Sequence, residues 1–201
     1  ADPWSPEFLL RIHSRYCAAL PPDMLQLSDG STMVPGQWRH QHVKVGQHMP
    51  PAPQAIPQFL ERFSATQHAL QGRETRLLNA IAGHHRLAWI HPFPDANGRV
   101  CRIATDAQLN ALGIRAGTLW SWSRGLAKDD ARYKIALANA DEPRQGAHDG
   151  RGNLSTRMLL EFTTFGLNVA IDQAKFMASM LQLDDLKRRV EAHFVRERAD
   201  L

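Results

Sequence analysis

The segment HPFPDANGRVCR, residues 91–102, holds side chains that could bind and transfer phosphate. Its two prolines disfavour helix before Asp95, whereas the residues after Gly98 favour it, so a helix is expected to begin near Asn97. The first N–H groups of a helix lack acceptors and carry partial positive charge, and small residues at the turn let phosphate approach them closely. The segment therefore predicts an anion site at a helix start.

The side chains around this turn extend the prediction. Arg99 and Arg102 share one face of the expected helix and suit a di- or triphosphate. Asp95 supplies a hard oxygen ligand that could hold Mg²⁺ against phosphate oxygens, and His91 titrates near neutral pH and could act as a general base. Phe93 is expected to anchor the loop to the core. These residues describe a phosphate-transfer site, and neither the Walker nor the Rossmann glycine pattern is present.

The elements that must position this segment are predicted to be helical. Ser5 and Ser155 are candidate N-caps, and Gly113 is placed where a C′ glycine belongs. Residues 32–46 alternate like a strand and predict a short β-hairpin, and the proline-rich residues 48–57 are interpreted as a surface crossing. Apolar periodicity predicts an all-α fold with helices at about residues 5–20, 58–70, 74–89, 97–112, from 129 or 130, 155–181 and 184–199.

Composition limits the classes of partner. The net charge of +4 allows an acidic partner, but no run of five or six basic residues is present, so nucleic-acid binding is not the expected main function. No apolar run reaches the length that crosses a bilayer and the start lacks a secretory signal, which predicts no membrane partner and a cytoplasmic location and leaves delivery to another cell open. Cys17 and Cys101 are expected to be free thiols.

Two groups near the segment have competing interpretations. His84 and His85 could join His91 in a metal cluster, but neighbouring residues of a helix face different directions, so roles in or beside the core are favoured. Cys101 could be a reactive thiol between the two arginines, and a position in the core is favoured for it as well.

The segment resembles the Fic signature, H-x-F-x-[DE]-[GA]-N-G-R-x-x-R. Residues 35–53 resemble the flap of Fic domains and the segment after it, and residues 123–137 and 150–162 resemble later helices of the family. The resemblance covers roughly residues 5–182 of a single predicted catalytic domain, residues 1–201, with a helix at about 184–199 beyond that core. The signature positions are matched by His91, Phe93, Asp95, Ala96, Asn97, Gly98, Arg99 and Arg102.

The resemblance implies a Fic-type helical bundle that adenylylates proteins, moving AMP from ATP to a hydroxyl group of a protein substrate. It implies that His91 deprotonates the hydroxyl and that Asp95 holds Mg²⁺ on the α- and β-phosphates. Asn97 and the backbone on either side of it would form the anion hole for the α-phosphate. Arg99 and Arg102 would hold the β- and γ-phosphates. The chemistry is consistent, because the arginines would stabilise the departing pyrophosphate.

The resemblance also assigns residues outside the segment. The flap would align the backbone of the target by strand addition, and an exposed strand without a function is the alternative. Tyr133 and Leu137 are candidates for the adenine pocket, although apolar residues at helical spacing are more often core. The flap residues predicted to position the target are Trp38, Arg39, His40, His42, Val43 and Lys44.

Alternatives to adenylylation remain open. Ala96 replaces the glycine of many members and also occurs in the branch with the Doc toxins, which move the γ-phosphate, whereas Gly98 and Arg102 favour nucleotidyl transfer. Transfer of UMP or phosphocholine in the same site, or a nucleotide-binding regulatory module without catalysis, are the other possibilities. Intact His91 and Asp95 argue against the last.

Regulation is predicted from what the sequence does not contain. Many Fic proteins carry an inhibitory helix, [ST]-x-x-x-E-[GN], whose glutamate pairs with the second arginine of the signature. No glutamate of this sequence fits that pattern. The inhibitory segment is therefore expected upstream of Ala1 or on an antitoxin-like partner, and the chain alone is expected to be active and to modify itself.

Overall fold

The computed structural model describes residues 1–114 and 120–199, and within these ranges it is all-α and contains no β-sheet. Two short 3₁₀ turns, Pro22–Leu25 and Pro53–Ala55, lie in the long connection between the first two helices. The predicted fold class is thus confirmed. The helices are α1 (Pro6–Ala18), α2 (Ile56–Ala69), α3 (Arg73–Ile90), α4 (Asn97–Ala111), α5 (Trp122–Lys128), α6 (Asp130–Asn139), α7 (Thr156–Met180) and α8 (Leu183–Ala199).

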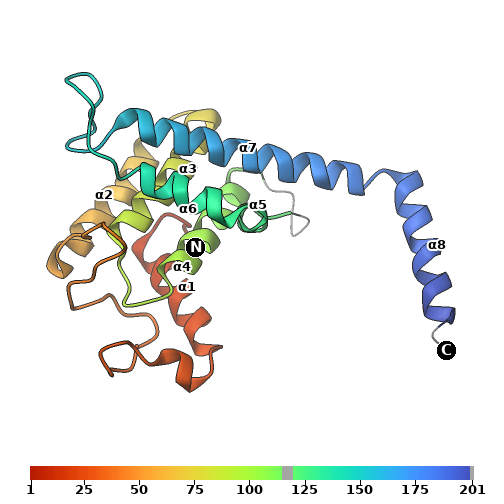
Figure 1. The fold of residues 1–201 in the computed structure, drawn as a ribbon, viewed down its shortest axis with the longest axis horizontal. Coiled ribbons are helices and arrows are strands. Elements are labelled where there is room, and N and C mark those ends of the chain that lie inside the picture. The colour runs from red at the N-terminus through yellow and green to blue at the C-terminus, as the bar shows by residue number, and fades with distance from the viewer. Residues whose placement is uncertain (115–119, 200–201) are drawn as a thin grey trace.

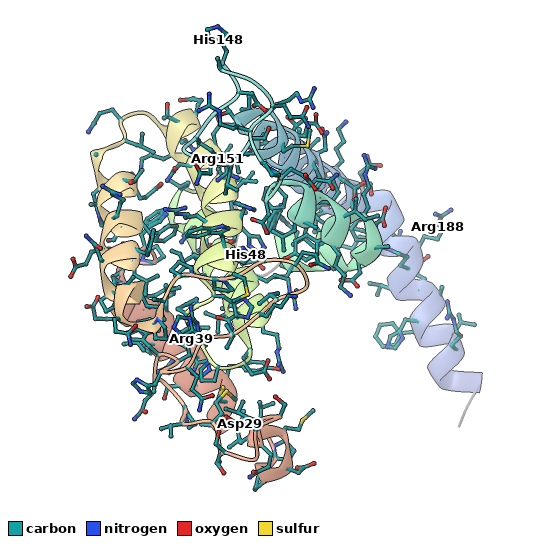
Figure 2. All side chains as sticks on the ribbon, turned by 60° about the vertical axis from the view of Figure 1, so that its left-hand side comes forward. Asp29, Arg39, His48, His148, Arg151 and Arg188 are labelled. Atoms are coloured by element: carbon teal, nitrogen blue, oxygen red, sulfur yellow. The ribbon has the colours of Figure 1, made fainter. Side chains whose placement is uncertain are left out.

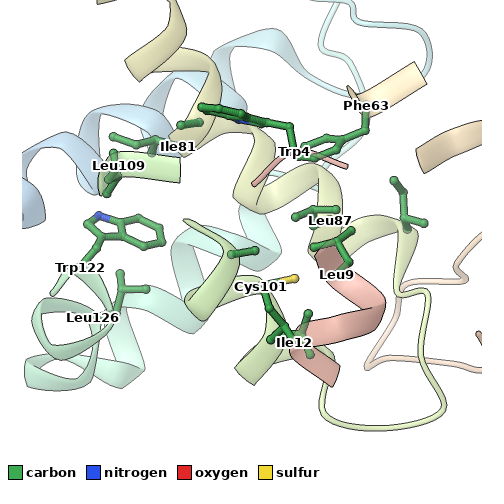
Figure 3. Packing of buried hydrophobic residues seen from close by; sticks show 14 of the residues in the cluster. Trp4, Leu9, Ile12, Phe63, Ile81, Leu87, Cys101, Leu109, Trp122 and Leu126 are labelled. Atoms are coloured by element: carbon green, nitrogen blue, oxygen red, sulfur yellow. The ribbon is translucent and has the colours of Figure 1, made fainter. Parts of the chain in front are cut away.

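Helix α3 is central to the bundle, and α2, α4 and α7 pack around it (Figure 1). Figure 3 shows the core that joins them, with Ile81 of α3 near Leu109 and Trp122, and Leu87 of α3 beside Leu9 of α1. A Cβ added to Gly166 of α7 would lie 2.5 Å from Ile81 Cγ2, so only glycine allows this approach of α7 to α3. The indole of Trp122 fills the same region and donates its N–H to the Gly166 carbonyl at 2.8 Å. Tight packing here fixes α3, which ends at the candidate site.

Serine caps start three of the helices. The side chain of Ser5 accepts from Phe8 N–H at 3.1 Å and that of Ser155 from Met158 N–H at 3.1 Å, as the sequence predicts. Ser121 caps α5 in the same way, but α5 is only 7 residues long, and apolar periodicity did not predict it, although it overlaps the range 123–137 that resembles later helices of the family. Its start also depends on a distant residue, because the carboxylate of Asp106 in α4 accepts from Trp122 N–H at 2.7 Å.

The end of α7 and all of α8 extend away from the bundle (Figure 1). Exposed apolar side chains follow one another along α8 at Leu186, Val190 and Phe194. Within the described residues, no helix combines the length and the apolar character needed to span a membrane.

The predicted β-hairpin is not formed. In the described chain, residues 32–46 make only isolated bridges, Gln26 with Thr32 and Val45 with His48. The backbone donors at the start of this segment bond elsewhere: Gly36 N–H donates to His13 Nδ1 at 2.9 Å and Arg39 N–H to the Pro92 carbonyl at 2.9 Å. Because those groups are engaged by α1 and by the 91–97 loop, they cannot form a ladder across a hairpin.

Candidate active site

His91 ends α3 in the left-handed region, with φ 49° and ψ 60°. Its backbone N–H donates to the Leu87 carbonyl at 3.0 Å, which completes the last turn of the helix. The ring Nδ1 lies 3.3 Å from the Ala88 carbonyl. Because a carbonyl only accepts, Nδ1 carries the proton in this contact, and Nε2 keeps its lone pair. The ring is thus oriented as a general base would need to be.

Burial lowers the pKa of His91 to about 4. The positive charge of Arg39 and the ring of His48 act in the same direction, whereas the bond to Ala88 and the charge of Asp95 oppose it. His91 is therefore neutral at pH 7, which is the form that can take a proton.

The loop from His91 to α4 is held by Asn97. The Asn97 side chain accepts from Phe93 N–H at 2.9 Å and donates to the Phe93 carbonyl at 2.8 Å, and it is only 3% exposed. Ala96, directly before it, adopts the left-handed region with φ 63°. With both groups of its amide engaged by the loop, Asn97 can offer an anion its backbone N–H, while its side chain fixes the turn.

Phe93 is buried and anchors the loop between two rings. It stacks on His13 of α1 with 4.0 Å between ring centroids and an interplanar angle of 3°, and Trp38 packs on it at 4.9 Å. Trp38 thus contributes to the wall behind the loop rather than to an exposed strand.

His13 was not predicted as a site residue, yet it touches both sides of the site. Nδ1 accepts from Gly36 N–H, so the proton of the neutral ring is on Nε2, which lies 3.5 Å from Cys17 Sγ and near the Asp95 carbonyl. Burial lowers the pKa of His13. The sequence does contain a signal for His13, because it follows Ile12 in the apolar stripe of the first helix. A polar residue at such a core position needs a hydrogen-bond partner, so a structural role near the loop could have been predicted for it.

Arg99 joins the loop to α1. Its guanidinium donates to the Asp95 carboxylate at 3.0 Å and to the Tyr16 hydroxyl at 3.0 Å, and lies 5.1 Å above the ring of Tyr16. Tyr16 was not predicted at the site. The Asp95 side chain is 53% exposed, so its carboxylate remains open to a further cation.

The start of α4 presents donors without protein acceptors. Within residues 1–114 and 120–199, the backbone N–H groups of Asn97, Gly98 and Arg99 have no hydrogen-bond partner. A Cβ on Gly98 would lie 3.6 Å from Arg102 Nη1, so the guanidinium folds back toward this turn. In the same ranges, no carboxylate lies within ion-pair distance of Arg102. Donors and positive charge therefore converge on one exposed point.

The predicted flap divides into a fixed base and an exposed edge. Arg39 is only 2% exposed, and its guanidinium donates to the carbonyls of His91 at 2.7 Å, Gln41 at 2.9 Å, Pro51 at 2.6 Å and Ile90 at 3.4 Å. The prediction that Arg39 faces a target is therefore wrong, because its charge is consumed in bracing the end of α3. The exposed residues are His40, His42 and Lys44, with Val43 half-buried.

A cleft of about 470 Å³ lies within this segment and borders the loop. One wall comes from residues 27–45, and His91 and Pro94 belong to the other. His91 therefore lines the cleft together with the exposed residues of the segment. In Figure 2, Asp29 and Arg39 of this segment and His48 just after it follow one another upward along this side of the bundle.

The sequence profile of the Fic/DOC family matches residues 3–109, more than half of the 201 residues. The chain belongs to this family. The match includes the whole segment 91–102 and ends inside α4.

Relatives and solved structures agree with the family. The protein adenylyltransferases Fic of Drosophila mojavensis and Drosophila melanogaster are 36% and 35% identical over 83 residues, which cover 41% of this chain and 16% of each relative. A Fic family protein from Desulfovibrio desulfuricans G20 superposes with a TM-score of 0.64 at 19% identity, covering 90% of this chain and 49% of that one. The N-terminal FIC domain of Bep8, a VirB-translocated effector of Bartonella sp. 1-1C, gives 0.57 at 15% identity, covering 83% and 73%. The chain thus shares the Fic fold and spans about a sixth of the length of the curated relatives.

The remaining predicted residues lie in the core of this Fic domain. The Tyr133 hydroxyl bonds to His84 Nε2 at 2.8 Å, and His84 Nδ1 bonds to Thr105 Oγ1 at 2.9 Å. Tyr133 is buried and Leu137 packs half-buried against the same cluster, so Tyr133 does not line an open adenine pocket. The guanidinium of Arg102 reaches the Tyr133 hydroxyl, which makes Tyr133 a support for that arginine.

The other two groups that the sequence left open are also buried. Burial raises the pKa of Cys101 to about 12, so its thiol is inert at neutral pH. Burial lowers the pKa of His84 to about 3, and the ring of His85 is bonded to Asp141 at 2.9 Å. All three lie in or beside the core, as the sequence predicts.

Proposed function

We propose that this Fic domain transfers AMP from ATP to a hydroxyl side chain of a protein. The observation that carries the proposal is the juxtaposition of a neutral His91, whose Nε2 has a free lone pair, with the unpaired N–H groups at the start of α4. Arg99 and Arg102 add the positive charge that a triphosphate requires. Family members with the printed name protein adenylyltransferase Fic support the same reaction.

The reaction follows from these positions. The hydroxyl of the target gives its proton to His91 Nε2 as its oxygen attacks the α-phosphorus of ATP. A new P–O bond forms, the bond between the α-phosphorus and the bridging oxygen breaks, and pyrophosphate leaves. The N–H groups at the start of α4 stabilise charge on the α-phosphate, and the arginines stabilise charge on the pyrophosphate. Asn97 contributes by holding the turn in place.

The residues present fit a Mg²⁺ ion bound together with ATP. Asp95 provides one exposed carboxylate next to the anion site, and Mg²⁺ in phosphate-transfer sites is held by one or two carboxylates and by phosphate oxygens. When bound, the ion would neutralise phosphate charge. The Asp95–Arg99 ion pair at 3.0 Å keeps both side chains near the helix start.

The cleft between residues 27–45 and the loop is proposed to hold the target chain. Its exposed rim at His40, His42 and Lys44 contacts the target, whereas the buried Arg39 and the half-buried Trp38 hold the rim in place. An Arg102 without a carboxylate partner in the described ranges also fits the proposal that this chain is active without a further signal and labels itself.

Incubation of the chain with ATP labelled at either the α- or the γ-phosphate, with Mg²⁺ present, tests the proposal. Protein labelled only from the α position is the expected result, and His91→Ala should remove it by a factor of about 10²–10⁴. Label only from the γ position would show phosphoryl transfer instead. An absence of label with nucleotide still bound would show a binding module.

A further inference from the structure

A second cationic cavity lies away from the catalytic loop, between α2, α3, the loop before α7 and the start of α7. Its volume is about 310 Å³, at the lower end of the range for small-molecule sites. We call it the arginine cavity. In Figure 2, Arg151 lies above His48 and Arg39, toward the loop that carries His148, and so away from the flap. Its polar lining residues are Arg62, Thr66, Asn79, His85, Arg86 and Arg151.

The three arginines of this cavity lack carboxylate partners. In the described parts of the chain, none of Arg62, Arg86 and Arg151 forms an ion pair. Asp141 is close to Arg151, but its carboxylate is bonded to His85. Arg86 and Arg151 are half-buried, and Arg62 is exposed at the rim. Arg151 donates to the carbonyls of Ala140 and Ser155, which are neutral, so no carboxylate within ion-pair distance offsets the charge of any of the three.

The three positive charges lie close enough to repel one another. Burial lowers the pKa of Arg86, and the charge of Arg62 lowers it further. Burial likewise lowers the pKa of Arg151, with Arg86 as the next cause. Arg86 faces the rings of Phe59 and Trp89, at 5.3 and 4.6 Å, rather than an anion. Positive charge is therefore concentrated around the cavity, and a bound anion would relieve the repulsion.

His85 adds an independent sign of a ligand. It is 1% exposed and lines the cavity, and its Nδ1 has no hydrogen-bond partner among the described residues. Since Nε2 is bonded to the Asp141 carboxylate, Nε2 carries the proton and Nδ1 is an unmet acceptor. A buried polar atom without a partner costs free energy, and a hydroxyl group can supply the missing donor.

We infer that the arginine cavity binds a small phosphate monoester that bears hydroxyl groups, of the sugar-phosphate type. The phosphate oxygens would accept from Arg62, Arg86 and Arg151, and a hydroxyl would donate toward His85. Thr66 and Asn79 offer neutral polar groups to the rest of the sugar. The site is separate from the reaction proposed for His91 and does not depend on it.

Calorimetric titration of ribose 5-phosphate into the Arg99→Gln/Arg102→Gln chain tests this inference without interference from the catalytic anion site. Saturable binding is expected, with uncharged ribose binding at least about tenfold more weakly. Arg62→Glu, added to the same background, should weaken binding by about tenfold or more, because it replaces an attractive charge by a repulsive one. Arg62 is exposed, so this substitution leaves the fold intact.

Arg196→Glu on the distant, exposed α8 is the matched control for the change of net charge, and it should leave the affinity unchanged. The inference is overturned by a lack of saturable binding up to about 10 mM, which is weaker than metabolite sites generally bind. Equal binding of ribose, or equal weakening by Arg62→Glu and Arg196→Glu, would overturn it as well.

Discussion

His13 connects Gly36 of the flap segment to Phe93 of the 91–97 loop, and its replacement should lower both stability and the proposed activity. In His13→Ala, the Gly36 N–H loses its acceptor at 2.9 Å, which costs about 1–3 kcal/mol where the donor is not resolvated. Loss of the stack on Phe93, with centroids at 4.0 Å, adds about 0.5–1.5 kcal/mol. The expected loss of unfolding free energy is about 2–4 kcal/mol, measured by urea denaturation.

Two further variants separate these contributions. His13→Phe keeps a ring against Phe93 but leaves Gly36 N–H without an acceptor, whereas His13→Gln keeps an acceptor and loses the ring. His68→Ala, an exposed histidine paired with Asp2 on the surface, is the matched control and should cost less than about 1 kcal/mol.

The functional part of the prediction uses labelling from α-labelled ATP at a temperature where each variant is folded. Because the stack and the bond near the Asp95 carbonyl fix the loop, His13→Ala should lower kcat by about tenfold or more, beyond any loss of folded protein. His13→Phe should recover part of this loss. The reasoning fails if His13→Ala labels as fast as the wild type, or if its stability lies within about 0.5 kcal/mol of it.

Three other predictions concern the site and its support. Because the folded pKa of His91 is about 4, kcat/KM should stay level from pH 8 to about pH 5 and fall as the pH drops through about 4. An inflection near the ordinary histidine pKa of about 6.5 would contradict the argument that burial lowers the pKa of His91. Asp95→Asn should raise the Mg²⁺ concentration needed for half-maximal labelling, because an amide attracts a cation far less than a carboxylate, and an unchanged titration would remove Asp95 from the ion. Gly166→Ala should lower stability by about 1–3 kcal/mol in thermal melts, since its methyl would lie 2.5 Å from Ile81; without that contact the same change would stabilise α7 by about 1 kcal/mol.

Local signals in the sequence were sufficient for most of the helices. Ser5 with Pro6, and Ser155 before a long apolar run, are caps whose effect depends only on neighbouring residues, and the helices begin where these caps predict. The start of α4 at Asn97 could also be predicted, because the prolines and glycine around it act locally. The 7-residue α5 could not, since its first N–H groups bond to Asp106, a residue far from it in sequence.

Whether a charged side chain is exposed or buried depends on tertiary structure, and the local sequence pattern gave the wrong prediction for Arg39. Arg39 alternates with His40 and Lys44 in a pattern typical of an exposed strand. The structure buries Arg39 because four backbone carbonyls, from three separate parts of the chain, converge on its guanidinium. The same convergence draws the segment onto the bundle and leaves no partner strand, so the error on Arg39 and the error on the hairpin have one cause.

The signature segment combines residues that we propose act on a ligand with residues that hold an unfavourable backbone. His91 and Ala96 both adopt left-handed φ angles, which cost a non-glycine residue about 1–2 kcal/mol each. These two strained residues bracket the loop, and the Asn97 amide and the Arg39 guanidinium supply hydrogen bonds that hold it closed.

Ala96 shows how the strain is offset at one position. Glycine would adopt φ 63° without steric cost, whereas alanine is strained there. The Ala96 methyl is buried against Cys17 and Met33, and this apolar contact offsets part of the strain. The alternation of glycine and alanine at this point of the signature then has a physical basis, since either residue satisfies the turn. A larger side chain would meet both the left-handed backbone and the filled space beside Cys17, so the turn that exposes the N–H groups of α4 restricts the residue there to the two smallest.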